Sequence, residues 1–123
     1  MSISEIITFS LIAVIAFFVI KRFLNAKSVK QYSPVEAKEK MKNNNVVLLD
    51  VRTKNERISR KINGSIHIPL NELHSRADEL NKHKQKEIIC YCRSGNRSLS
   101  AAVLLKKKGY NIANLKGGIV GWS

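Results

Sequence analysis

The segment from residue 87 to residue 109 limits the fold more strongly than any other part of the sequence. The apolar run EIICYC at 87–92 has the length and the β-branched content of a buried strand. After a short polar turn, SLSAAVLLKKKG at 98–109 places alanines and leucines on one helical face and ends in three lysines and a glycine, as a helix does. A strand that leads directly into a helix predicts one half of a β–α–β unit, and therefore a parallel sheet.

Further elements alternate along the chain in the same way. The sequence SPVE at 33–36 offers a serine N-cap, a proline at the first helical position and a glutamate that closes a capping box, so it predicts a helix to about Lys42. Asn71 is expected to cap another helix, which runs to about Asn81. Short strands are predicted at 46–50, 66–69 and 111–115. This alternation predicts an α/β fold with a central parallel β-sheet flanked by helices.

The N-terminal 24 residues are apolar on every side of a helix. The run at 6–20 has fifteen residues, of which only Thr8 and Ser10 are polar. A spanning helix needs about 20 apolar residues, and Phe23 and Leu24 extend the run. A cleaved signal peptide fits less well, since no basic residue precedes the run, and a buried core helix would be amphipathic. We therefore expect one transmembrane anchor helix at 1–24.

Charge predicts how the rest of the chain is placed. Basic residues follow the apolar run and none precedes it, and basic flanks stay in the cytoplasm. We expect a single-pass membrane protein with a basic linker at 25–32 and a cytoplasmic domain at 33–123. The formal net charge of +13 then suits a domain that faces the anionic lipids of the inner leaflet. A nucleic-acid partner is not expected, because aromatic residues are not interleaved with the basic ones.

The polar turn at 92–97 has the composition of an anion-binding loop. It joins a strand end to a helix start, where unpaired N–H groups and the positive end of the helix dipole favour negative charge. Gly95 permits a positive φ, which can turn further N–H groups inward. Such surroundings lower the pKa of a cysteine and make Cys92 a candidate thiolate nucleophile. The alternative is an inert core cysteine, which is the interpretation we adopt for Cys90 in the middle of the strand.

The strand at 46–50 also ends in polar residues. In parallel sheets, ligands bind beyond the carboxyl ends of the strands. Asp50 and Arg52 lie at such an end, and we expect them to shape the site through hydrogen bonds and ion pairing without taking part in the chemistry.

Four segments together resemble one protein family. CRSGNRS at 92–98 resembles the active-site loop of the rhodanese-like sulfurtransferases. LLDVRTKNE at 48–56, GSIHIP at 64–69 and LKGGIVGW at 115–122 resemble three further motifs of that family, in the same order. The resemblance covers about residues 30–122, and four ordered motifs are far more specific than any one of them.

The resemblance implies a rhodanese-like domain that moves sulfane sulfur from a small anionic donor, such as thiosulfate or a persulfide, to a thiol or cyanide acceptor. Cys92 would carry the sulfur as a persulfide in a two-step covalent cycle. Backbone N–H groups of the loop would hold the outer sulfur, Arg93 would attract the donor, and Arg97 would hold the loop. The substrate-binding residues are then Arg93, Ser94, Gly95, Asn96 and Arg97. No metal or cofactor is implied, and no protein partner is indicated.

Two departures and two alternatives accompany this interpretation. Arg57 stands where the family commonly has an aromatic residue, and Arg60–Lys61 replace a usual Gly-His, so we expect a more basic rim around the site. A related phosphatase pattern has five residues between Cys and Arg, whereas four separate Cys92 from Arg97. The other alternative is a membrane-tethered binding module without turnover, although inactive relatives commonly lack the cysteine.

Overall fold

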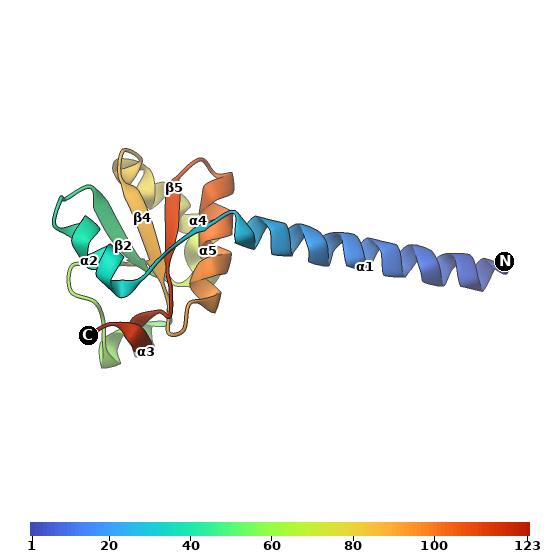
Figure 1. The fold of residues 1–123 in the computed structure, drawn as a ribbon, viewed down its shortest axis with the longest axis horizontal. Coiled ribbons are helices and arrows are strands. Elements are labelled where there is room, and N and C mark those ends of the chain that lie inside the picture. Colours follow the sequence, from blue (N-terminus) through green and yellow to red (C-terminus); the bar gives the residue numbers. More distant parts are fainter.

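The computed structural model describes all 123 residues of the chain. A long N-terminal helix projects from an α/β domain (Figure 1). The helices are α1 (Ile3–Lys27), α2 (Pro34–Met41), α3 (Lys54–Ser59), α4 (Leu70–Arg76) and α5 (Asn96–Lys107), with 3-10 helices η1 (Ala77–His83) and η2 (Ile119–Gly121). The strands are β1 (Lys30–Tyr32), β2 (Val46–Asp50), β3 (Ile66–His67), β4 (Glu87–Tyr91) and β5 (Asn111–Leu115).

The five strands form one sheet in the order β1-β5-β4-β2-β3, and every neighbouring pair is parallel. The predicted parallel α/β architecture is therefore confirmed. β3 lies on one side of β2, and the later strands β4 and β5 lie on the other side. The order thus reverses between β2 and β4, which is where an open α/β sheet forms its ligand-binding crevice. The segments that follow β2 and β4 meet at this point.

Each face of the sheet has its own hydrophobic core. Side chains of β4 alternate between them, since successive residues of a strand point to opposite faces. Ile88 and Cys90 belong to the core under α4, η1 and α5, together with Cys92 just beyond the strand. Ile89 and Tyr91 belong to the opposite core, which also contains Ala37 of α2 and Ile119 of η2. The alternation therefore directs Cys92 toward the α5 side of the sheet.

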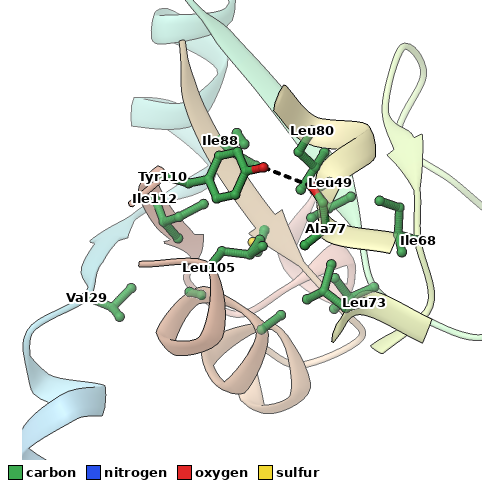
Figure 2. Packing of buried hydrophobic residues seen from close by; sticks show 14 of the residues in the cluster. Val29, Leu49, Ile68, Leu73, Ala77, Leu80, Ile88, Leu105, Tyr110 and Ile112 are labelled. Carbon is green, nitrogen blue, oxygen red and sulfur yellow. Dashed lines mark hydrogen bonds between the residues drawn. The ribbon is translucent and has the colours of Figure 1, made fainter. Parts of the chain in front are cut away.

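Tyr110, which follows α5, closes the first of these cores. Figure 2 shows its ring among the buried aliphatic side chains and its hydroxyl directed at Ala77. The hydroxyl donates to the carbonyl oxygen of Ala77 over 2.9 Å and lies 2.7 Å from Oδ1 of Asn81. The helix predicted to run to about Asn81 is divided into α4 and the 3-10 helix η1, and Tyr110 contacts the residue at which η1 begins.

Two predicted helix starts differ from the observed ones. α4 begins at Leu70, with Pro69 before it, so Asn71 lies within the helix and does not cap it. α5 begins at Asn96 with Gly95 at the N-cap, two residues before the predicted start. By contrast, α2 has the predicted capping box, in which the backbone N–H of Glu36 donates to the Ser33 hydroxyl over 3.2 Å.

The linker predicted at 25–32 is mostly ordered secondary structure. α1 continues to Lys27, and Lys30–Tyr32 forms the edge strand β1 beside β5. Tyr32 explains the difference, because its ring is buried and its hydroxyl donates to Glu87 over 2.7 Å. The linker was predicted from the lysines of this segment, whereas the contacts of Tyr32 hold the segment against the sheet.

α1 is long and apolar enough to cross a membrane, and none of its residues is buried by the rest of the chain. Its 25 residues extend over about 38 Å at 1.5 Å per residue. A helix with an apolar surface on all sides has no stable arrangement in water unless something covers it.

Candidate active site

Cys92 lies at the carboxyl end of β4, at the reversal of strand order. Its side chain is almost fully buried, and its sulfur accepts two hydrogen bonds from the following turn. The backbone N–H of Gly95 donates over 3.1 Å, and the hydroxyl of Ser98 donates over 3.3 Å. A sulfur atom surrounded by donors is favoured as the anion.

The two cysteines have opposite acid–base properties. Burial alone would raise the pKa of Cys92, but hydrogen bonds from the side chain and backbone of Ser98 and from the backbone of Gly95 and Ser94 outweigh it, so the pKa is lowered. Burial raises the pKa of Cys90 to about 12, and the nearby Cys92 adds to this effect. Only Cys92 therefore has the character of a thiolate nucleophile.

Gly95 forms the bend that turns these donors toward the sulfur. Its φ of 106° lies in the left-handed region, which glycine adopts without steric cost. Asn114 of β5 holds the bend from behind, donating from Nδ2 to the Gly95 carbonyl over 3.2 Å. The bend also starts α5, so the positive end of the helix dipole faces the sulfur.

Gly118 supports the same loop from below. The backbone N–H of Ile119 donates to the carbonyl of Cys92 over 2.9 Å, and that of Val120 donates to the carbonyl of Arg93 over 3.2 Å. A Cβ atom on Gly118 would collide with the Arg93 carbonyl and lie only 2.5 Å from the Cys92 carbonyl oxygen. The closeness of Gly118 to the loop was not predicted from the sequence, although the double glycine at 117–118 permits a close approach of the backbone.

Arg97 does not donate a hydrogen bond to the Cys92 sulfur and instead forms an ion pair with Glu56 of α3. Its Nη1 and Nη2 lie 2.6 and 2.7 Å from the two carboxylate oxygens of Glu56. Hydrogen bonding from Arg97 is the main cause that lowers the pKa of Glu56 to about 2. Glu56 was quoted only as part of a motif, and α3 was not predicted, although Thr53 and Glu56 form a capping box that could have revealed both.

Asp50 and Arg52 form a buried ion pair beside the site. Nε and Nη2 of Arg52 lie 3.0 and 2.9 Å from the two carboxylate oxygens of Asp50, and the two side chains are 4% and 0% exposed. Tyr91 donates its hydroxyl to the same carboxylate over 3.1 Å. Burial opposes ionisation of Asp50, but the hydrogen bonds from Arg52 outweigh it and lower the pKa. The pair stabilises the conformation of the segment that follows β2, and neither side chain hydrogen-bonds to the Cys92 sulfur.

Arg57 corrects one part of the expectation of a more basic rim, whereas Arg60 and Lys61 are exposed as expected. Its guanidinium turns inward, donating from Nη1 to Asp50 over 3.2 Å and from Nη2 to the carbonyl of Ser65 over 2.7 Å. Its side chain is only 17% exposed. The carboxylate of Asp50 attracts it, so this guanidinium is partly buried and contributes less charge to the surface than a free arginine would.

The remaining predicted residues lie on the outside of the loop. Arg93, Ser94 and Asn96 are exposed, and the Arg93 guanidinium forms no ion pair or hydrogen bond within the chain. A free guanidinium beside a thiolate can attract an anion. The structure contains no group of three or more His, Cys, Asp or Glu side chains placed to hold a metal ion.

Comparison with known proteins adds an independent result. Residues 33–123 match the rhodanese-like domain. A sulfurtransferase of Allochromatium vinosum is 35% identical over 79 residues, which make up 63% of this chain and 72% of that protein. YrkF of Bacillus subtilis is 38% identical over 101 residues, and the chain spans 54% of its length. The crystal structure of a rhodanese-related protein from Thermoplasma volcanium matches with a TM-score of 0.70 and 33% identity, covering 76% of this chain and 89% of that one.

Proposed function

Since the chain belongs to the rhodanese-like domain family, we propose that it is a sulfurtransferase that carries sulfane sulfur as a persulfide on Cys92. The observation that carries the proposal is the ring of donors around this one sulfur atom. The same donors that favour a thiolate also suit the terminal sulfur of a persulfide, which carries negative charge.

The proposed cycle has two displacement steps. The Cys92 thiolate attacks the outer sulfur of a donor such as thiosulfate, the donor's S–S bond breaks, and sulfite leaves with the electron pair. The new Cys92–S–S⁻ group is then attacked at its terminal sulfur by a thiolate or cyanide. The persulfide S–S bond breaks, and Cys92 leaves as a thiolate, so no external oxidant or reductant is needed.

Arg93 and Arg97 have different proposed roles. The free guanidinium of Arg93 attracts an anionic donor to the mouth of the loop. Arg97 holds the start of α5 against α3 through Glu56. This pairing also argues against the phosphatase alternative, because an arginine that binds phosphate must direct its donors into the loop.

We also propose that α1 spans a membrane once, with the domain on the cytoplasmic side. Its length, its apolar surface and the basic residues that follow it support this arrangement. The test is alkaline carbonate extraction of membranes that contain the full chain, combined with protease digestion of vesicles of known orientation. Release by carbonate, or protection of the domain in vesicles with the cytoplasmic face outward, would contradict the proposal.

Intact mass spectrometry of the full chain in detergent tests the sulfur chemistry. After incubation with thiosulfate or glutathione persulfide, we expect a gain of one sulfur atom, which cyanide removes as thiocyanate. Cys92→Ser should gain none, and Cys90→Ser is the matched control that should still load.

Absence of an adduct with every donor would refute the sulfurtransferase proposal, provided that the protein is folded and its Cys92 thiol reacts with iodoacetamide. A binding module without turnover would then become the leading explanation.

A further inference from the structure

A large hollow lies where α1 meets α5. It has a volume of about 660 Å³, and neither Cys92 nor its hydrogen-bond donors Gly95 and Ser98 line it. α1 contacts α5, and its C-terminal end lies beside that helix while the rest of α1 projects away from the domain (Figure 1). The hollow is lined from α1 by Phe18, Lys21, Arg22, Asn25 and Ala26, and from α5 by Asn96, Leu99, Ser100, Val103 and Lys107.

The position of the hollow along α1 places it at a membrane surface. Its α1 residues begin at Phe18, inside the apolar run, and end at Ala26, beyond the first basic residues. Eight residues of helix correspond to about 12 Å. A bilayer whose hydrocarbon layer surrounds the apolar run would therefore have its headgroup layer at this hollow. α5 would lie beside α1 at that depth.

The lining combines two kinds of chemistry. Phe18, Leu99 and Val103 give it an apolar part. Lys21, Arg22 and Lys107 give it a basic part, and none of these three forms an ion pair in the structure. No acidic residue lines the hollow.

We propose that the hollow binds one anionic phospholipid, with the phosphate at the basic residues and the upper acyl chain against the apolar ones. The proposal rests on the membrane span proposed above, and it names a discrete site where the sequence indicated only a general attraction to anionic lipids. Charge complementarity and continuity with the apolar surface of α1 favour this occupant over a protein segment. Because Asn96 belongs to the Cys92 loop and also lines the hollow, bound lipid would keep the mouth of that loop beside the bilayer surface.

Native mass spectrometry of the full chain tests the site. The protein is purified from mixed micelles that contain phosphatidylglycerol and phosphatidylcholine in equal amounts, and the retained lipids are counted. We expect one retained phosphatidylglycerol per chain, preferred by about tenfold or more over phosphatidylcholine, because Lys21, Arg22 and Lys107 attract its anionic headgroup and phosphatidylcholine carries no net charge.

Two variants separate a site from diffuse attraction. Lys107→Gln should reduce the preference several-fold while leaving the charges next to the span intact. Val103→Trp should lower retention of the lipid by narrowing the apolar part of the hollow without changing charge. The charge-matched control Lys116→Gln changes an exposed lysine outside the hollow and should behave like the wild type.

The outcomes distinguish this inference from the proposals on which it depends. Equal retention of both lipids, or a preference that survives Val103→Trp, would overturn the lipid site. Carbonate extraction of the same sample reports on the span alone, and loading of Cys92 with sulfur reports on the enzyme alone. A chain that resists carbonate and loads sulfur but shows no lipid preference would refute only the inference made here.

Discussion

Arg97 and Glu56 meet in a two-pronged ion pair that fastens the first turn of α5 to α3, with N–O distances of 2.6 and 2.7 Å. The same carboxylate accepts hydrogen bonds from the backbone and the hydroxyl of Thr53, over 3.3 and 3.1 Å. One side chain therefore positions both the helix that follows the Cys92 loop and the turn that follows β2. These two segments flank the crevice from opposite sides.

Glu56→Gln should loosen this arrangement. The substitution removes the charge that pairs with Arg97 and weakens the capping box, so we expect a loss of about 1 kcal/mol in the free energy of unfolding. Urea unfolding of the full chain in detergent measures it. The matched control is Glu79→Gln, which breaks the solvent-exposed pair with Arg76 and should change stability little. An equal loss in both variants would show that the Glu56 contact has no special role.

The same pair should make stability depend on pH. The pKa of Glu56 is about 2 in the folded chain, below its ordinary value of 4.5, because Arg97 holds the charged form. A depressed pKa contributes stability that is fully present above about pH 4.5 and is lost as the pH falls toward about 2. Unfolding curves between pH 6 and pH 2.5 should therefore converge for wild type and Glu56→Gln as the pH falls; a constant gap would contradict this account.

Ser98→Ala should make Cys92 a weaker nucleophile at neutral pH. The variant removes the hydroxyl that donates to the sulfur over 3.3 Å, so the pKa of Cys92 should rise. We expect alkylation by iodoacetamide at pH 7 to slow by up to about tenfold, the effect of one hydrogen bond to a charged group. The midpoint of the rate-against-pH curve should move upward. Ser100→Ala, on the exposed side of α5, is the control, and an unchanged midpoint in Ser98→Ala would refute the assignment.

Asp50→Asn should destabilise the domain severely. The carboxylate is fully buried and balances both Arg52 and Arg57, so its neutralisation leaves two guanidinium groups without a counter-charge. Breaking a buried ion pair typically costs about 3–5 kcal/mol. Urea unfolding measures the change, with Asp78→Asn as the control because Asp78 is exposed. A loss below about 1 kcal/mol would mean that water or a rearranged partner replaces the charge.

Helices and strands could be predicted from the sequence where adjacent residues encode them, and not where they depend on contacts between distant residues. The strand at β4 and the capping box of α2 are encoded by adjacent residues, and both were predicted. β1 was missed because three residues with two exposed side chains have no apolar pattern, and their pairing partner lies more than eighty residues away. The contact between Tyr110 and Ala77 likewise joins residues far apart in the chain, and no local pattern predicts it.

The site shows the same division. Cys92 and the glycine of its turn could be found because the loop is one continuous segment. Arg57 was expected to be a surface charge, because the sequence does not show that its guanidinium lies close enough to donate a hydrogen bond to the Asp50 carboxylate. The support given by Gly118 depends on a contact between residues 92–93 and 118, which no local pattern records.

Gly118→Ala should displace the Cys92 loop. The residue has φ 61° and ψ −159°, a region open almost only to glycine, and the added methyl group would collide with the carbonyls of Cys92 and Arg93. We expect sulfur loading of Cys92 to slow by more than about tenfold, because backbone strain of roughly 1–3 kcal/mol falls on the loop itself. Gly64→Ala is the matched control: Gly64 also has a positive φ, but a methyl group there meets no atom within 4 Å. If both alanine variants load sulfur equally fast, strain alone accounts for the glycine, and its support of the loop has no functional consequence.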